Sequence, residues 1–124
     1  MKARPSAGVT IYHNPNCSTS KYAITAAQEH GVSYTEVRYL KDKPDRATLE
    51  QLVAQLEDPP EDLIRKDSLF KRLELDPDDY VGDPDAVIEL LSERIALLQR
   101  PVLVKRGRAI IGRPKDRVIP FLTE

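Results

Sequence analysis

The sequence contains a single cysteine, Cys17, among 124 residues. A chain with one cysteine forms no internal disulfide, which is typical of proteins from a reducing compartment, so we expect a cytoplasmic location. If Cys17 is oxidised during a reaction, the thiol that reduces it must come from another molecule. We also expect no metal site, because only Cys17, His13 and His30 could supply sulfur or imidazole ligands.

The sequence also lacks an excess of charge of either sign. Nineteen basic side chains stand against 20 acidic ones, which gives a formal net charge of −1. Without an overall basic field, we expect no binding to nucleic acid and none to anionic membranes. No apolar run is long enough to cross a membrane, and no apolar core follows the charged N-terminus. We therefore expect neither a membrane span nor a secretory signal.

At 124 residues, of which 40% are hydrophobic, the chain is long enough for one domain with a full core and too short for two. We therefore expect a single domain over residues 1–124, with a flexible tail at 1–8. The first part of this domain has the pattern of a βαβ unit, in which the two strands are parallel. Its elements are a buried strand at 9–12, a helix at 18–30 closed by Gly31, and a second strand at 34–40.

Residues 45–98 are expected to form a helical insertion with no strand. Apolar spacing and helix-start signals predict helices at 45–56, 61–66, 68–73 and 83–98. Two apolar strands follow, at 102–104 and 109–111, and their short connection requires an antiparallel hairpin. A closing helix is expected near 118–122, although Pro120 disfavours it. This order predicts an α/β fold: a thioredoxin-like mixed sheet of two parallel strands plus an antiparallel C-terminal hairpin, with a large helical insertion.

Cys17 lies where the first predicted strand gives way to the first helix. The helix dipole and the unpaired amides of a helix N-terminus stabilise a thiolate, and cysteine pKa values fall to roughly 3.5–7.5 in such places. Ser18 and Ser20 add hydroxyl donors near the sulfur. A lone cysteine is often only a small buried apolar residue, but this position favours a reactive thiol. His13, four residues earlier, either bonds the backbone or helps to keep Cys17 ionised.

Three familiar kinds of cysteine site do not fit the residues around Cys17. A thioredoxin-type dithiol needs a second cysteine at position 20, which is Ser20. A cysteine phosphatase loop needs an arginine six residues after the nucleophile, where this chain has Ala23. A metal site needs more thiolates or imidazoles than the chain has. The remaining interpretation is a monothiol that attacks a substrate and is then reduced by an external thiol.

Basic residues near the C-terminus indicate that the substrate is an anion. Between positions 105 and 117, six basic residues stand against the single acid Asp116: Lys105, Arg106, Arg108, Arg113, Lys115 and Arg117. We expect Lys105, Arg106 and Arg108 to be the solvated tip of the hairpin, as surface lysines and arginines usually are.

Arginines elsewhere are better placed to hold a substrate. Arg100 and Arg113 each precede a proline at a strand boundary, where the chain direction is fixed. The planar guanidinium suits tetrahedral oxyanions, because it donates paired hydrogen bonds. Arg65 lies in a short helical piece, and spacing alone does not separate it from Arg72 or Arg94.

The loop Tyr12–Ser20, with the sequence YHNPNCSTS, resembles the active-site loop of the glutathione- and glutaredoxin-linked arsenate reductases of the ArsC type. The resemblance extends along nearly the whole chain through four further segments: Tyr39-Leu40, Leu63–Lys66, Arg100–Val102 and Gly112–Pro114. It implies a thioredoxin-like fold with a helical insertion, in agreement with the pattern of strands and helices.

The resemblance also implies roles for particular residues. Cys17 would be the catalytic nucleophile, and His13 would assist it. Three arginines would form the oxyanion pocket: Arg65, Arg100 and Arg113. Further substrate contacts would come from the loop around the cysteine: Asn16, Ser18 and Ser20. Pro101 would have a structural role beside the cysteine, with a cis peptide bond.

The chemistry that the resemblance implies is the reduction of arsenate to arsenite. The Cys17 thiolate attacks arsenate, glutathione attacks the adduct, and glutaredoxin clears the mixed disulfide that results. Glutathione is then a co-substrate, glutaredoxin a protein partner, and no cofactor is bound. Two alternatives remain open. One is an ArsC-like thiol reductase of another substrate. The other is a non-enzymatic transcriptional regulator of the Spx kind, which Ser20 disfavours because many such proteins carry Cys-x-x-Cys.

Overall fold

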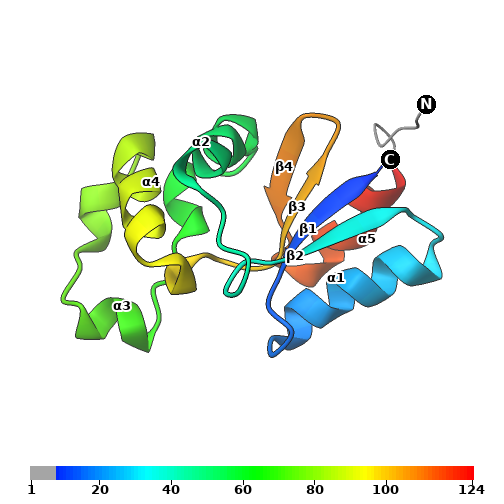
Figure 1. Cartoon of the computed structure of the whole chain (residues 1–124), viewed down its shortest axis with the longest axis horizontal. Helices are drawn as coiled ribbons and strands as arrows, with labels where there is room; N and C mark the ends of the chain where they lie inside the picture. The colour runs from blue at the N-terminus through cyan, green and yellow to red at the C-terminus, as the bar shows by residue number, and fades with distance from the viewer. Residues whose placement is uncertain (1–7) are drawn as a thin grey trace.

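The computed structural model describes residues 8–124, so most of the tail expected at 1–8 lies outside the described residues. Its centre is a four-stranded sheet in the order β2-β1-β3-β4 (Figure 1). The strands are β1 (Val9–His13), β2 (Tyr34–Arg38), β3 (Val102–Lys105) and β4 (Arg108–Ile111). β1 is parallel to β2 and antiparallel to β3, and β3 is antiparallel to β4. The predicted mixed sheet with its C-terminal hairpin is confirmed.

Two helices, α1 (Ser18–Glu29) and α5 (Val118–Thr123), cover one face of the sheet (Figure 1). Val9 and Ile11 of β1 are buried on this face, among alanines of α1 and Phe121 of α5. Because side chains alternate along a strand, Tyr12 is buried on the opposite face, in the core shared with the helical block between β2 and β3. The loop that carries Cys17 leaves the carboxyl end of β1 and leads directly into α1.

The helical block between β2 and β3 alternates α-helices with short 3₁₀ segments. In order they are α2 (Arg46–Gln55), η2 (Pro60–Leu63), α3 (Ser68–Arg72), η3 (Pro77–Tyr80), α4 (Pro84–Glu93) and η4 (Ile95–Leu97). The α-helices begin at aspartates whose side chains accept a first-turn amide: Asp45, Asp67 and Asp83. The large helical insertion expected from the sequence is therefore present.

Two helices of this block are shorter than the sequence pattern predicts. The helix expected at 83–98 ends at Glu93, because Arg94 leaves the helical region with φ −137° and ψ 71°. The helix expected at 61–66 is only the 3₁₀ segment η2, after which Ile64 is extended and forms an isolated β-bridge with Leu98. This bridge brings the segment that carries Arg65 beside the segment that leads to β3.

The β3–β4 hairpin turns at Arg106 and Gly107, which both have positive φ, at 53° and 76°. Two such residues give the tight turn that matches the twist of paired strands. The expectation that Lys105 belongs to the solvated tip is wrong, because this residue is only 6% exposed. Its Nζ donates to three carbonyl groups at the end of the closing helix: Phe121, Leu122 and Glu124. The last carbonyls of a helix lack partners within it, and Lys105 supplies a charged donor.

The closing helix expected near 118–122 is also present, as the 3₁₀ segment η5 (Lys115–Arg117) followed by α5. Pro120 is the third residue of α5. The first amides of a helix have no partner within it, so a proline in this turn interrupts no helical hydrogen bond. For this reason Pro120 does not prevent the helix.

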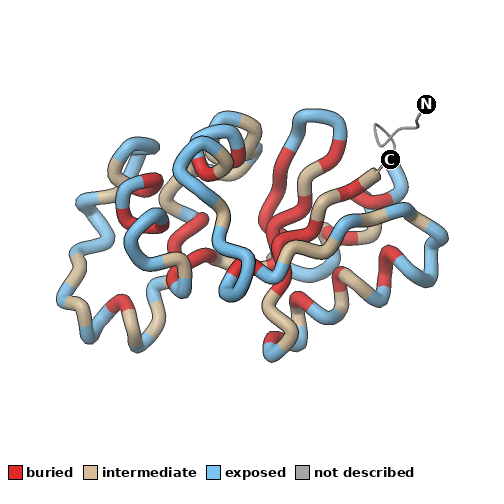
Figure 2. The backbone as a smooth tube through the Cα atoms, in the orientation of Figure 1, coloured by how far each residue is buried: buried red, intermediate tan, exposed pale blue. Residues whose placement is uncertain are grey.

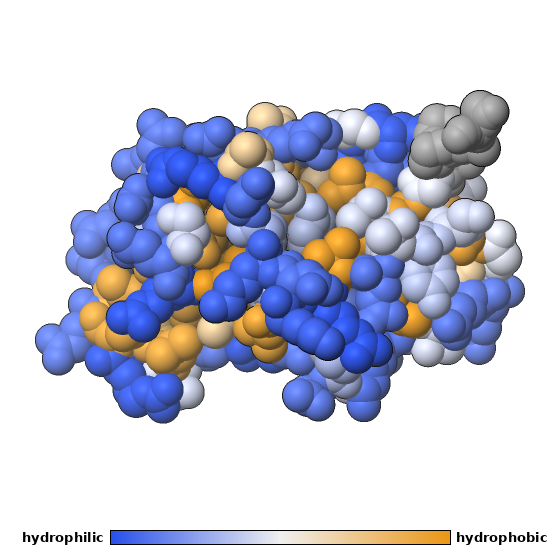
Figure 3. Space-filling view, in the orientation of Figure 1, coloured by the Kyte–Doolittle hydropathy of each residue, from blue (hydrophilic) through white to orange (hydrophobic). Residues whose placement is uncertain are grey.

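Buried residues follow the strands and the inner sides of the helices (Figure 2). The face drawn in Figure 3 is largely hydrophilic, with separate apolar patches over the helical block. Among the described residues, the exposed large apolar side chains are Leu40 and Val81. Between residues 8 and 124, no helix has both the length and the apolar character needed to cross a bilayer.

Candidate active site

Cys17 ends the loop between β1 and α1 and is the N-cap residue of α1. Its N–H donates to the carbonyl oxygen of Asn14 at 3.0 Å, and the Asn14 side chain accepts the N–H of Asn16 at 2.9 Å. These bonds fix the path of the chain just before the helix begins. Cys17 is only 8% exposed. Its thiol is therefore held, largely buried, at the positive end of α1.

His13 contacts Ser20 rather than the cysteine. Its Nδ1 lies 2.6 Å from Oγ of Ser20, which also accepts the N–H of Asn14 at 3.0 Å. On the other side, Nε2 of His13 lies 3.9 Å from a carboxylate oxygen of Glu36. Burial lowers the pKa of His13, although the charge of Glu36 acts in the opposite direction. A largely neutral His13 therefore holds Ser20, and through it the start of the Cys17 loop.

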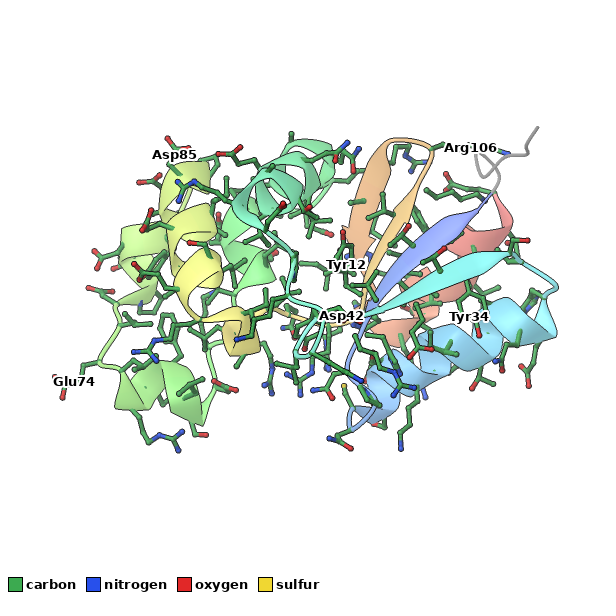
Figure 4. All side chains as sticks on the ribbon, viewed as in Figure 1. Tyr12, Tyr34, Asp42, Glu74, Asp85 and Arg106 are labelled. Carbon is green, nitrogen blue, oxygen red and sulfur yellow. The ribbon has the colours of Figure 1, made fainter. Side chains whose placement is uncertain are left out.

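Arg113, distant from Cys17 in the sequence, contacts its sulfur and also holds the main chain of Arg100. Nη2 of Arg113 donates to Sγ of Cys17 at 3.3 Å, and Nε of Arg113 donates to the carbonyl oxygen of Arg100 at 2.7 Å. Both arginines precede cis prolines, Pro101 and Pro114, so the cis bond expected at Pro101 is present. Figure 4 shows nitrogen-bearing side chains gathered where the sheet meets the helical block, near this loop.

The surroundings of Cys17 lower the pKa of its thiol. Burial alone would raise this pKa, but it is outweighed by the nearby side chain of Arg100 and the amide of Ser20, with a further contribution from the amide of Thr19. The hydrogen bond from Arg113 acts in the same direction, because a charged donor stabilises an anionic acceptor. The site is thus built to present a thiolate.

Arg65 lies in a segment that pairs with the chain leading to Arg100. Its main chain is fixed by a hydrogen bond from its N–H to the carbonyl oxygen of Leu97 at 2.7 Å. Its guanidinium forms an ion pair with Asp67 at 2.8 Å, and both side chains are about one quarter exposed, at 28% and 27%. No pattern in the sequence marks Asp67 as the partner of Arg65.

The other loop residues for which we expect substrate contacts differ in exposure. Asn16 and Ser18 are exposed, whereas Ser20 is fully buried. The Ser20 hydroxyl is engaged by His13 and by the main chain of Asn14, as described above. In this arrangement the Ser20 side chain shapes the loop, and its amide is one of the groups that lower the pKa of Cys17.

Two buried polar atoms, from Arg100 and Tyr39, lack hydrogen-bond partners. Between residues 8 and 124, the buried side-chain nitrogen or oxygen atoms without a hydrogen bond are Nε of Arg100 and the hydroxyl of Tyr39. In the sequence, Tyr39 stands near the end of the expected second strand and belongs to a segment of the family resemblance, but neither feature assigns it a role in the site. The register of the parallel strands β1 and β2 places Tyr39 beside the start of the Cys17 loop. The sequence predicts that the two strands are parallel but does not give their register.

A cavity of about 350 Å³ lies on the side of Arg113 that faces the helical block. Its charged lining combines both signs: Asp58, Asp62, Lys66, Arg113 and Arg117. Arg117 and Asp58, which both line it, form an ion pair at 2.9 Å. Arg113 connects this cavity with the thiol, because it lines the cavity and also contacts Cys17.

The fold and the site together define a class of protein: a thioredoxin-like protein with a single cysteine, whose thiol lies at a helix N-terminus and accepts a hydrogen bond from an arginine. Comparison with known proteins specifies the family. The sequence model of the ArsC family matches residues 12–121, and the chain therefore belongs to the ArsC family.

Relatives of the chain span nearly its whole length. An arsenate reductase of Neisseria meningitidis serogroup B is 34% identical over 112 residues, covering 89% of this chain and 94% of that protein. The uncharacterized protein YfgD of Escherichia coli K12 is 35% identical over 116 residues, covering 92% of this chain and 96% of that protein. The solved structure of an arsenate reductase from Vibrio cholerae has a TM-score of 0.81 at 32% identity. It covers 94% of this chain and 98% of that one.

Proposed function

We propose that this protein reduces arsenate to arsenite with Cys17 as a monothiol nucleophile, and that glutathione and glutaredoxin supply the electrons. The observation that carries the proposal is the hydrogen bond from Arg113 to the Cys17 thiol, beside a second guanidinium, that of Arg100, which lowers the pKa of the thiol. A thiolate beside two guanidinium groups suits a substrate that is itself a small oxyanion. The relatives named arsenate reductase support this substrate.

In the first step, the Cys17 thiolate attacks arsenic(V). A sulfur–arsenic bond forms, and one arsenate oxygen leaves as water after taking up protons. The guanidinium groups of Arg100 and Arg113 offset the negative charge that gathers on the remaining oxygens. Amides at the start of α1 give further donors, because the first turn of a helix leaves them unpaired.

In the second step, the glutathione thiolate attacks the sulfur of Cys17. A disulfide forms between Cys17 and glutathione, and the sulfur–arsenic bond pair passes to arsenic, which leaves as arsenite. Arsenic gains two electrons and the two sulfur atoms lose them. A glutaredoxin thiol then attacks the glutathione sulfur and releases the Cys17 thiolate. The charged cavity beside Arg113 has room for glutathione, whose ends carry both signs of charge. This cycle needs a reducing compartment, as the cytoplasm is.

The proposal is tested by arsenate-dependent oxidation of NADPH in the presence of glutathione, glutathione reductase and glutaredoxin. The native protein is expected to turn over, Cys17→Ser to lose the arsenate-dependent rate, and Arg65→Ala to lose most of it. Asp67→Asn is the comparison variant for Arg65→Ala, because it removes the ion pair but keeps the Arg65 guanidinium. If Arg65 binds the oxyanion, the two variants change the KM for arsenate in opposite directions.

A different result would redirect the assignment. An inactive native protein whose Cys17 is alkylated rapidly at neutral pH would show that the thiolate serves another substrate. Other oxyanions and protein disulfides would then be assayed in the same coupled system. Omission of glutaredoxin alone tests the reductant, since turnover without it contradicts the proposed last step.

A further inference from the structure

The hydroxyl of Tyr39 and Nε of Arg100 are buried polar atoms without a hydrogen-bond partner, as described above. Tyr39 has no exposed surface at all. Buried polar groups in proteins are nearly always hydrogen-bonded, so each such atom needs an explanation. Two of them near the same cysteine indicate that a bound group with acceptor atoms completes the site.

The sheet register places Tyr39 at the Cys17 loop. β1 and β2 are parallel, and their last paired residues are His13 and Arg38. The next residues along the two strands are Asn14, which begins the loop, and Tyr39. Tyr39 therefore stands at the carboxyl end of β2, beside the start of the segment that carries the nucleophile.

The tyrosine ring is directed into the core on the side of the helical block. It shares this core with Leu63, Ile64 and Leu98, which flank the segments that carry Arg65 and Arg100. Burial raises the pKa of Tyr39, the charges of Arg100 and Arg65 and the nearby side chain of Asn14 act against this effect, and the charge of Cys17 adds to it. The hydroxyl therefore lies within reach of the charges of the site. The Asn14 side chain is close to the hydroxyl but does not have the geometry of a hydrogen bond with it. A phenol with a raised pKa keeps its proton at neutral pH and remains a hydrogen-bond donor.

We propose that Tyr39 is a substrate-binding residue whose hydroxyl donates a hydrogen bond to an oxygen of the oxyanion held by Arg100 at Cys17. Nε of Arg100 supplies a second donor to the same anion. The inference rests on the proposed function. It assigns the Tyr39 hydroxyl as a neutral donor on the side of the anion that faces the helical block. A neutral donor binds an oxyanion without adding to the mutual repulsion of the arginines.

The test uses Tyr39→Phe, which removes one oxygen atom and keeps the ring. Arsenate is the probe, and its affinity is measured by calorimetry in the Cys17→Ser background, where no reaction can follow. Loss of a hydrogen bond to a charged group is expected to weaken arsenate binding by about 10-fold or more. In the native background, Tyr39→Phe is expected to raise the KM for arsenate by a similar factor.

Thermal unfolding separates this role from a structural one. Without arsenate, Tyr39→Phe is expected to keep or raise the Tm, because the buried hydroxyl that it removes has no partner. With arsenate, the variant is expected to gain less Tm than the parent protein. A hydroxyl that only supports the core would give the reverse pattern, with a lower Tm without arsenate and an unchanged affinity, and would overturn the inference.

Tyr12→Phe is the matched control. Tyr12 lies on β1 and is buried in the same core, but its ring borders a separate cavity under α2, with Thr48 and Gln51 (Figure 4). Removal of the Tyr12 hydroxyl is expected to leave the affinity for arsenate unchanged. If Tyr39→Phe and Tyr12→Phe both bind arsenate as the parent does, the Tyr39 inference fails and the proposed function stands. If the Cys17→Ser protein binds no arsenate and the native protein does not turn over, both fail.

Discussion

Arg113 and Cys17 are 96 positions apart in the sequence and are joined by a hydrogen bond of 3.3 Å from Nη2 to Sγ. The same guanidinium donates from Nε to the carbonyl oxygen of Arg100 at 2.7 Å. A planar guanidinium can make both contacts at once, because its donors point in fixed directions. Arg113 therefore couples the segment after β4 to the loop that carries the nucleophile.

This geometry makes Arg113→Lys a demanding substitution. Lysine keeps the positive charge but has one nitrogen on a flexible stem, so it cannot reproduce both hydrogen bonds. We expect kcat/KM for arsenate to fall by roughly 10- to 100-fold, since a hydrogen bond to a charged group contributes about 1.5–3 kcal/mol. The coupled NADPH assay measures the change. Arg106→Lys, on the exposed hairpin turn, is the control and should be fully active. Equal activity of the two variants would show that charge alone is required.

Arg100→Gln should raise the pKa of Cys17. Burial of the thiol already acts to raise this pKa, and Arg100 is the leading side chain that opposes it. Below the pKa, the thiolate fraction falls tenfold for each unit of increase, while the nucleophilicity of the thiolate recovers part of the loss. The alkylation rate with iodoacetamide is therefore expected to fall about threefold for each unit. A pH profile of this rate for the native protein and the variant gives both pKa values.

The sign of the change in the Cys17 pKa tests this role of Arg100. A variant pKa at or below that of the native protein would show that Arg100 does not stabilise the thiolate. In that event the amides of Ser20 and Thr19, together with Arg113, would account for the lowered pKa.

His13 should make the stability of the protein depend on pH. Burial lowers the pKa of His13 below its ordinary value, so the unfolded chain takes up a proton at a higher pH than the folded protein does. The free energy of unfolding therefore falls as the pH decreases from the ordinary histidine value toward the lowered one. The loss contributed by this residue is at most about 1.4 kcal/mol per pH unit.

The measurement for His13 is urea unfolding at several values between about pH 7 and about pH 5, where an ordinary histidine titrates. His13→Gln keeps a polar side chain beside Ser20 but does not titrate. It is expected to lose less stability toward acid than the native protein. Parallel losses in the two proteins would show that His13 has an ordinary pKa and that other groups control the acid response.

Much of the fold could be predicted from the sequence because its signals are local. Alternating apolar residues, aspartate caps and short turns act within a few positions, and they located the sheet, the hairpin and the helical block. The predictions were wrong where contacts between residues distant in the sequence determine the local structure. Lys105 follows an exposed pattern but is drawn inward by the free carbonyls at the end of α5. The helix from Pro84 stops at Glu93, where the chain must turn back toward β3.

For the site, the position of Cys17 at a helix N-terminus could be read from the strand-to-helix change. The contacts of Arg100 and Arg113 could not be predicted from the sequence. They depend on how the start of β3 and the segment after β4 pack against the loop that carries Cys17. Arg65 lies in an ion pair with Asp67, which no sequence pattern distinguishes from an exposed pair. The unpartnered hydroxyl of Tyr39 is visible only when every buried polar atom is placed.

Gly112 lies between β4 and Arg113 in a space too small for a side chain. A Cβ atom there would lie 2.8 Å from Cγ of Pro101, 3.0 Å from Cδ1 of Leu103 and 3.1 Å from Cγ2 of Val118. These distances are shorter than ordinary carbon–carbon contacts of about 3.5–4.0 Å. The atoms belong to a proline ring and to buried side chains, so relief requires movement of the chain next to Arg113.

Gly112→Ala is therefore expected to lower stability and reactivity together. Overpacking of this kind reduces the free energy of unfolding by about 1–3 kcal/mol, measured by urea unfolding. Because the backbone of Arg113 must shift, the alkylation rate of Cys17 at neutral pH should fall as well. Gly107→Ala is the control: its Cβ would meet no atom within 4 Å, and its positive φ of 76° adds strain only at the hairpin turn. It should lose about 1 kcal/mol and keep the native alkylation rate. A Gly112→Ala protein with native Cys17 reactivity would show that the sulfur contact does not depend on this close packing.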